Sequence, residues 1–433
     1  MPITIAKTNS AYEREPLLAP FGFKGGSLTE LWQTIGHLES ANGNTGLGLG
    51  TQSVLWSDAN VFTSRSETDG NRLMYDTTAH ALWALIGFKF DNPIDLIDPL
   101  VEETYDFARH ISGVDDLRLT FALNALVAVD NAVWQLYCAE NGITSFDDMV
   151  PAEFRPALPL RHDKLVNSAL MTYGTPLDEV VRTVKDGCFL IKVKLGADPD
   201  KDGDREKMLE WDKQRLSSIH DKVKDLETPY TENGRIAYYL DANGRYDGKD
   251  RLMRLLDHAA EIGALDRIAI FEEPFPEDLE LDVKDIPVRM AADESAHSDE
   301  DALERIQTGY RAIALKPIAK TMSMSLKIAK VARENDVPVF CADLTVNPVL
   351  ADWNKNVAAR LAPLPGVKIG MVEVNGPQNY RNWETMKSYH PCRDARWIDS
   401  ERAIFHLGDD FYAQSGGILK QSKHYRELLK ADS

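Results

Sequence analysis

Residues 188–196 read CFLIKVKLG, residues 235–244 read RIAYYLDANG, and residues 267–275 read RIAIFEEPF. Each stretch is an apolar, β-rich run that ends in charged side chains. Five further runs of this kind begin at Leu165, Val288, Arg311, Val337 and Lys368. The segments between the runs have helical patterns, and such alternation is typical of βα units in a parallel sheet. Eight strands close a barrel, so the sequence predicts an α/β fold with a (β/α)7β TIM-like barrel over residues 161–384.

Two of the intervening segments carry helix start signals. Residues 175–187, TPLDEVVRTVKDG, place Pro176 and acidic residues in the first turn of a helix. Residues 298–310, SDEDALERIQTGY, offer Ser298 as the N-cap and Asp301 at the position that completes a capping box. Both segments are therefore predicted to be crossover helices of the barrel.

The chain before the barrel has a different pattern. It contains the glycine-rich stretch SANGNTGLGLG at residues 40–50 and a long helical pattern over residues 117–142. The alternating glycines lack the G-x-G-x-x-G spacing of a dinucleotide loop, so they predict a hairpin. We expect residues 1–160 to form an α+β capping domain, completed by residues 385–433, which should pack back on it.

Composition narrows the classes of function. The chain has 433 residues and a net charge of −19 from 49 basic and 68 acidic side chains, which argues against nucleic acid as a partner. No apolar run is long enough for a membrane span, and the first residues do not resemble a secretory signal, so we expect a cytoplasmic protein. The four cysteines show no metal spacing and are expected to be reduced. A homo-oligomer is compatible with the sequence.

Motifs of several common enzyme classes are absent from the sequence. It contains no Walker A, HExxH or GxSxG pattern. This argues against several common classes of nucleotidase and hydrolase, whose active sites depend on these motifs. In a barrel of the predicted kind, the reactive groups lie at the carboxyl ends of the strands, so the charged residues that close the apolar runs are the candidates.

Two lysines close the second predicted strand. Because side chains alternate along a strand, Lys192 and Lys194 lie on the same side and can both face the barrel mouth. A neighbouring ammonium group makes a lysine easier to deprotonate. We therefore expect Lys194 to act as a base and Lys192 to be the cation beside it.

Three carboxylates close the next three strands. Asp241, Glu272 and Asp293 can converge on one point and provide the oxygen ligands that Mg²⁺ prefers. Lys316, on the sixth strand, is four strands from Lys194 and so lies on the opposite wall of an eight-stranded barrel. A small carboxylate substrate bound at the metal would present one face of its α-carbon to each lysine. The metal and the lysines would stabilise the enediolate that forms when the α-proton leaves.

The ordered set KVK, DAN, EEP, ADES and LKP is similar to that of the muconate-lactonizing subgroup of the enolase superfamily, whose use of a lysine base with Mg²⁺ is known. The resemblance implies that Lys194 and Lys316 are acid/base residues, that Lys192 is a flanking cation, and that Asp241, Glu272 and Asp293 bind one Mg²⁺. The seventh run has no histidine, and this disfavours the mandelate-racemase subgroup.

The resemblance also implies where the substrate lies. Dipeptide epimerases of this subgroup carry an Asp-x-Asp pair on the eighth strand that holds a substrate ammonium, whereas this chain has Glu373-Val374-Asn375. The specificity loops of the capping domain resemble residues 20–26 and 42–58. The substrate-binding residues are accordingly expected to be Asn243, Glu373, Asn375 and Lys24.

Three functions compete at this point. The first is a racemase or epimerase, an isomerase that acts on an amino-acid derivative or a dipeptide by moving the α-proton between two lysines. The second is a lyase or cycloisomerase similar to o-succinylbenzoate synthase or muconate cycloisomerase, in which one lysine transfers the proton and the other stabilises charge. The third is a barrel that binds metal and ligand without turnover, and retention of all six polar groups disfavours it.

Overall fold

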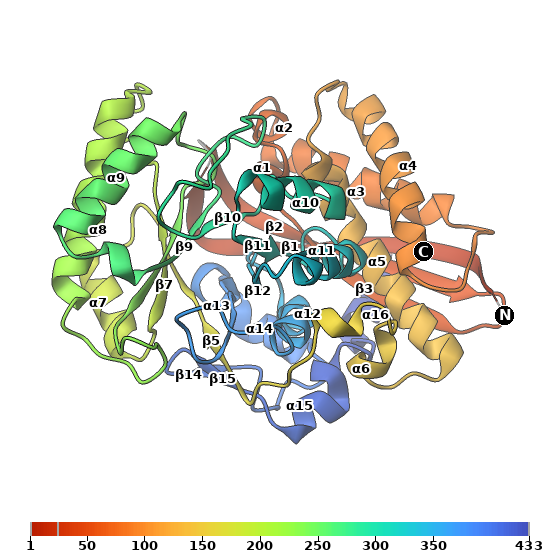
Figure 1. The fold of residues 1–433 in the computed structure, drawn as a ribbon. Helices are drawn as coiled ribbons and strands as arrows, with labels where there is room; N and C mark the ends of the chain where they lie inside the picture. The colour runs from red at the N-terminus through yellow and green to blue at the C-terminus, as the bar shows by residue number, and fades with distance from the viewer. Residues whose placement is uncertain (1, 24–25, 432–433) are drawn as a thin grey trace.

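The computed structural model describes residues 2–23 and 26–431. The amino-terminal part is a four-stranded antiparallel sheet with helices packed on it (Figure 1). Its strands, in the spatial order β3-β2-β1-β4, are β1 (Ile3–Phe23), β2 (Gly26–Ser40), β3 (Thr45–Gln52) and β4 (Lys89–Phe90). Its helices are α1 (Val54–Ser57), α2 (Ala59–Thr63), α3 (Glu67–Ala84), α4 (Ile94–Ser112), α5 (Leu119–Asn141), α6 (Phe146–Met149) and the 3-10 turn η1 (Arg155–Ala157). We call this part the cap.

The glycines of β3 allow α5 to lie directly on the sheet. Gly46 and Gly48 face this helix, and a Cβ atom at Gly48 would lie 1.9 Å from the carbonyl oxygen of Ala128. The predicted hairpin is confirmed, because β2 and β3 pair antiparallel on either side of the turn. The alternation of glycines therefore reflects the close approach of helix and strand backbones.

Replacement of Gly48 by alanine should destabilise the fold. The added methyl group can be accommodated only by separating two backbones, and overpacking of this kind costs about 1–3 kcal/mol or more in the free energy of unfolding. Urea unfolding would measure the change, with Gly174→Ala as the matched control because nothing lies within 4 Å of a Cβ atom there. Equal stability of the two variants would contradict this account of the glycine stripe.

The barrel contains all eight predicted strands in parallel. They are β5 with β6 (Lys164–Asn167 and Ala169–Met171), β7 (Leu190–Lys194), β8 (Ala237–Asp241), β9 (Ile268–Glu272), β10 (Met290–Ala292), β11 (Ala312–Leu315), β12 (Val339–Cys341) and β13 (Gly370–Val372). The first strand is interrupted at Ser168. Its first half pairs with β13 and its second half with β7, so the two ends of the sheet meet there. Ser168 itself donates to Val372 O and Leu190 O.

Helices fill six of the seven crossovers between these strands. They are α7 (Leu177–Lys185), α8 (Arg205–Val223), α9 (Lys249–Glu261), α10 (Asp299–Thr308), α11 (Met322–Glu334) and α12 (Pro348–Ala358), with the 3-10 turn η2 (Leu265–Arg267) before β9. The predicted capping box of Ser298 and Asp301 is present at the start of α10. The (β/α)7β expectation differs at one crossover, because residues 273–289 form a loop without a helix.

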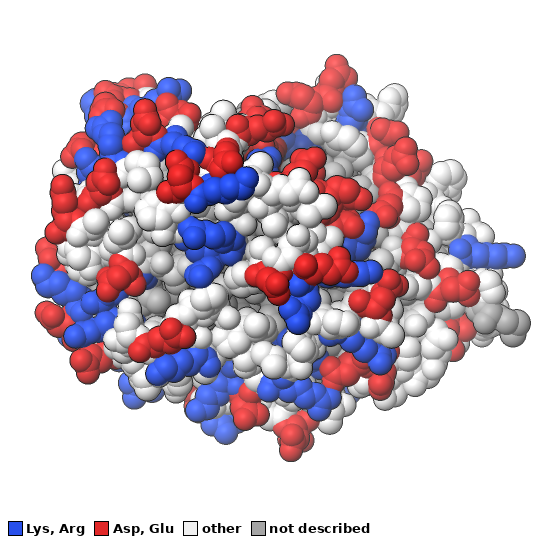
Figure 2. All heavy atoms as spheres, in the orientation of Figure 1, with Lys and Arg blue, Asp and Glu red and all other residues white. Residues whose placement is uncertain are grey.

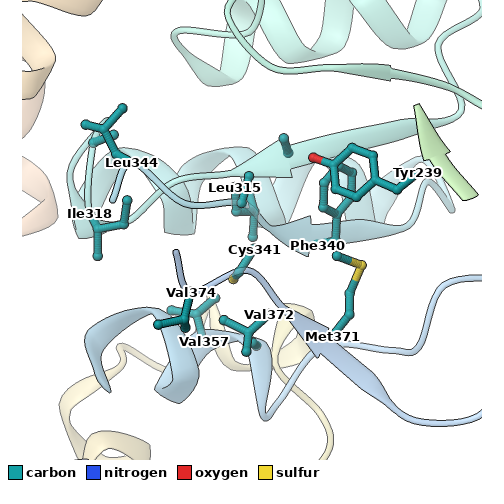
Figure 3. Close-up of a cluster of buried hydrophobic side chains, with 14 of the residues drawn as sticks. Tyr239, Leu315, Ile318, Phe340, Cys341, Leu344, Val357, Met371, Val372 and Val374 are labelled. Carbon is teal, nitrogen blue, oxygen red and sulfur yellow. The ribbon is translucent and has the colours of Figure 1, made fainter. Parts of the chain in front are cut away.

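Side chains alternate between the inside and the outside of the barrel along each strand. On β12, Phe340 points into the barrel, where its ring lies 5.5 Å from that of Tyr239, whereas Cys341 points outward (Figure 3). Figure 3 also shows Val357 of α12 beside Val372 and Val374 outside the sheet. Alternation thus sends every second strand residue into the barrel, and the last inward residues form its mouth.

The carboxyl-terminal segment contacts both parts of the molecule. Its elements are α13 (Gly376–Asn379), α14 (Trp383–Ser388), β14 (Ser400–Glu401), β15 (Ile404–His406), α15 (Asp409–Gln414), η3 (Ser415–Gly417) and α16 (Lys423–Ala431). Helix α16 packs on β1 of the cap, as expected. However, β15 pairs antiparallel with β5, so the segment also extends the barrel sheet. The segment therefore contacts the cap through α16 and the barrel through β15.

Two further expectations concern the interior. The structure contains free cysteines at all four positions, with Cys138, Cys188 and Cys341 buried. Among the described residues, α5 alone is long and apolar enough to cross a membrane, but 94% of its apolar stretch is buried inside the fold. Such burial is typical of a core helix of a globular protein.

Candidate active site

A cavity lies where the cap covers the mouth of the barrel. The cap contributes mostly apolar side chains, and the barrel contributes charged ones. The cap residues are Phe21, Phe23, Leu28, Leu31, Ser53 and Trp56, and the barrel residues are Leu170, Lys192, Lys194, Asp241, Asn243, Glu272, Lys316, Asp343, Leu344, Thr345, Glu373 and Asn375. An apolar roof over a charged floor is suited to a small ligand that has a carboxylate at one end.

Lys192 lies at the centre of the floor and is buried. Its Nζ lies 2.9 Å from Asp241 Oδ2, 3.2 Å from Glu272 Oε1 and 3.2 Å from Glu373 Oε2. Burial disfavours the ammonium, but the three carboxylates outweigh it and hold the pKa of Lys192 well above its ordinary value. Lys192 is therefore a fixed cation.

Lys194 lies beside Lys192 on the same side of β7, as the strand period predicts. Its Nζ donates to Asp241 Oδ2 at 2.6 Å and to Asn243 Oδ1 at 2.5 Å. The oxygen Asp241 Oδ2 thus contacts both ammonium groups and offsets their repulsion. The sequence-based expectation considered only the ammonium of Lys192 beside Lys194, whereas the structure adds a carboxylate oxygen that both lysines contact.

A group of carboxylates beyond the lysines can hold a divalent cation. Glu272, Asp293 and Glu294 are buried, and one ligand oxygen from each lies within 4.8 Å of the others. Asp293 Oδ1 accepts no hydrogen bond from the described residues and has Lys320 Nζ 3.2 Å away. Burial raises the pKa of Glu272 to about 7, opposed chiefly by Lys192. Buried carboxylates crowded in this way fit a hard divalent cation such as Mg²⁺.

This group shares two members with the predicted metal ligands. Asp241, the third predicted ligand, is instead engaged by Lys192 and Lys194, and these cations lower its pKa against the effect of burial. Glu294 takes its place in the group. Its Oε1 accepts from Asn243 Nδ2 at 3.0 Å, which connects the group to the end of β8.

Lys316 faces the same cavity from β11, four strands from β7 in the sheet order. Its Nζ donates to Asp293 Oδ2 and lies 4.5 Å from the centre of the Trp56 ring. Burial disfavours its charge, but Asp293 and Glu272 raise its pKa above the ordinary value. The indole comes from α1 of the cap, so a cation–π contact joins the cap to this lysine.

Several supporting residues were missed by the sequence reasoning. Lys320 is fully buried and donates to the carbonyl oxygens of Asp293 and Ala296. Glu273 has a φ of 37° and accepts from Asp293 N at 2.6 Å, so it orients the loop after β10. Tyr239 donates its hydroxyl to Glu272. Tyr239 could have been predicted, because the alternation of side chains along β8 points it into the barrel. Lys320 and Glu273 lie in loops, where no such alternation applies.

The predicted substrate-binding residues fall into two groups. Asn243, Glu373 and Asn375 line the cavity, and each contacts another residue of the site. Lys24 lies outside the described residues. Phe21 and Phe23, within the predicted specificity loop, do line the cavity. On the face of the molecule shown in Figure 2, acidic and basic side chains are interspersed.

Fold and site together define a capped (β/α) barrel with a lysine- and carboxylate-lined mouth. A sequence model of the family described as "Enolase C-terminal domain-like" matches residues 177–365. Over these residues the barrel is similar to that family, and the whole chain has the fold of a solved mandelate racemase/muconate lactonizing protein.

Solved structures show the same fold at low sequence identity. A mandelate racemase/muconate lactonizing protein from Herpetosiphon aurantiacus is 17% identical with a TM-score of 0.62, and 94% of this chain and 97% of that one are covered. A dipeptide epimerase from Enterococcus faecalis V583, complexed with Mg and L-Leu-L-Tyr, has 18% identity, a TM-score of 0.61 and the same coverage. An N-succinyl Arg/Lys racemase from Bacillus cereus ATCC 14579 has 17% identity and a TM-score of 0.61, with 88% and 89% covered. A sequence search of curated proteins finds no match.

Proposed function

We propose that this protein is a Mg²⁺-dependent racemase or epimerase that removes and returns the proton on the carbon next to a substrate carboxylate. The observation that carries this proposal is the placement of Lys194 and Lys316 at the ends of β7 and β11, with the carboxylate group at the ends of strands between them. Two lysines on opposite walls allow a proton to leave one face of the carbon and return to the other.

The charged residues of the floor would have different roles in this reaction. Glu272 and Asp293, with Glu294 or Asp241, would hold the divalent cation. When bound, the ion supplies a Lewis acid for the substrate carboxylate and the enediolate. Lys192 adds a fixed positive charge next to the developing negative charge, and one of the two flanking lysines takes the proton while the other returns it.

The cap excludes water from this chemistry. Phe21, Phe23 and Leu28 cover the floor with apolar surface, and Trp56 lies against the ammonium of Lys316. A covered site strengthens electrostatic interactions among the charged groups. The cap thus supports the substrate class that we propose, an amino-acid derivative or a dipeptide with an apolar substituent.

A lyase or cycloisomerase is the alternative on the same scaffold. Exchange of the α-proton in D₂O, followed by NMR for N-acyl amino acids, dipeptides and related carboxylates in both configurations, tests the proposal. Exchange from both enantiomers supports a racemase or epimerase. Exchange from one enantiomer only, with conversion to an unsaturated or cyclised product, favours the alternative, and no exchange from any carboxylate contradicts both.

Replacement of Lys192 by alanine should impair exchange from both enantiomers to the same degree. Its charge serves three carboxylates rather than one face of the substrate. The variant should also be less stable by about 3–5 kcal/mol, because buried carboxylates lose their shared cation. Exchange rates and thermal unfolding measure the two effects. A loss confined to one enantiomer would show instead that Lys192 transfers the proton.

A further inference from the structure

One end of the cavity carries a carboxylate that has no cationic partner among the described side chains. Asp343 follows β12 and is 7% exposed. Its Oδ2 accepts from the backbone of Asn375 at 2.6 Å, and its Oδ1 accepts weakly from the backbone of Val346 at 3.4 Å. Burial, followed by the charge of Glu373, raises the pKa of Asp343 to about 7. Such a group is stabilised by a cation that approaches from the cavity.

Asn375 provides a second acceptor at the same end. It is 3% exposed, and its Nδ2 donates to Glu373 Oε1 at 2.8 Å. The Oδ1 atom is buried and accepts no hydrogen bond from the part of the chain that the structure describes. A buried acceptor without a donor lowers the free energy of unfolding by about 1–3 kcal/mol. A hydrogen-bond donor on a bound ligand would satisfy this oxygen and remove that penalty.

Glu373, the other acid here, is already engaged. Its Oε2 accepts from Lys192 Nζ at 3.2 Å and from Asp343 N at 3.2 Å, and its Oε1 accepts from Asn375. Because both of its oxygens already accept hydrogen bonds, one of them from the ammonium of Lys192, Glu373 is less available to a cationic ligand than Asp343. Of these two acids, Asp343 is the one without a cationic partner among the described side chains.

We infer that Asp343 and Asn375 Oδ1 form a subsite for a cationic nitrogen of the substrate. The inference rests on the proposed function and deepens it. The ligand would be zwitterionic, with its carboxylate at the lysines and metal ligands, its ammonium at Asp343, and an apolar substituent against Phe21, Phe23 and Leu31. The carboxylate that recognises the ammonium would come from the end of the seventh strand, and Glu373 on the eighth would serve Lys192.

A purely structural role is the competing explanation of Asp343, since its carboxylate joins the loop after β12 to the backbone after β13. Two ligands of nearly the same shape separate the roles. L-alanyl-L-phenylalanine carries the ammonium, and N-propionyl-L-phenylalanine has the same skeleton without it. A structural role affects both ligands alike, whereas an ammonium subsite affects the ratio of their rates.

The full-length protein with Mg²⁺ should exchange the α-proton of the dipeptide with a higher kcat/KM than that of the propionyl analogue. Asp343→Asn should lower this ratio about 10² to 10³-fold, because truncation of one partner of a buried charge pair costs that much. Asn375→Leu should lower it about 10-fold or more. Asp394→Asn, with a side chain 93% exposed, is the matched control and should leave the ratio unchanged.

Calorimetric titration of the same proteins with both ligands separates the two proposals. Tighter binding of the dipeptide that is lost in Asp343→Asn, without proton exchange in either ligand, would contradict the proposed function and support the subsite. Exchange from both ligands with equal kcat/KM would support the function and overturn the subsite. An unchanged ratio in folded Asp343→Asn and Asn375→Leu would overturn it as well.

Discussion

Removal of divalent cations with EDTA should abolish α-proton exchange, and Mg²⁺ or Mn²⁺ should restore it. Without a cation, the negative charge of the enediolate would lie beside several buried carboxylates, with only the lysines to offset it. The expected loss is essentially complete, which makes this one of the two largest effects. Full exchange in a preparation shown by elemental analysis to be metal-free would end the assignment.

Substitution of the carboxylates distinguishes the two candidate ligand sets. Glu272 and Asp293 belong to both sets. Glu272→Gln and Asp293→Asn should therefore weaken Mg²⁺ binding by more than the ~10 to 100-fold that loss of a hydrogen bond to a metal ligand costs. Asp241→Asn and Glu294→Gln are the informative pair. The geometry predicts the larger loss of affinity for Glu294→Gln, measured by calorimetric titration with Mg²⁺ alone. The larger loss in Asp241→Asn would instead support the sequence-based set.

The second large effect concerns the two lysines on opposite walls. Lys194→Ala should abolish exchange from one enantiomer and spare part of the exchange from the other, and Lys316→Ala should show the reverse preference. Loss of a positioned acid or base costs about 10² to 10⁴ in rate, so the asymmetry is measurable by NMR in D₂O.

Lys327→Ala is a suitable control for this pair. This lysine forms ion pairs with Asp98 and Asp299 outside the cavity and should leave both exchange rates unchanged. Equal loss of exchange from both enantiomers in Lys194→Ala or in Lys316→Ala would favour the lyase or cycloisomerase. In that case, one lysine transfers the proton and the other stabilises charge.

The local pattern of residues was sufficient to predict the barrel strands and the inward direction of their side chains. Alternation along a strand depends only on backbone geometry, so Lys192, Lys194, Asp241, Glu272 and Lys316 could be placed at the mouth before any contact was known. The capping box at Ser298 was predictable for the same reason, because it involves only neighbours in the chain.

Tertiary packing decided the features that involve loops and the cap. Glu294, Lys320 and Asp343 follow the ends of strands, where side-chain direction depends on the contacts that each loop makes with distant segments. Trp56 reaches Lys316 only because the cap sheet and α5 place helix α1 over the barrel mouth. These contacts join residues far apart in the chain, and strand period and composition contain no information about them. The barrel and its inward charges therefore follow from local geometry, whereas the partners of those charges depend on long-range packing.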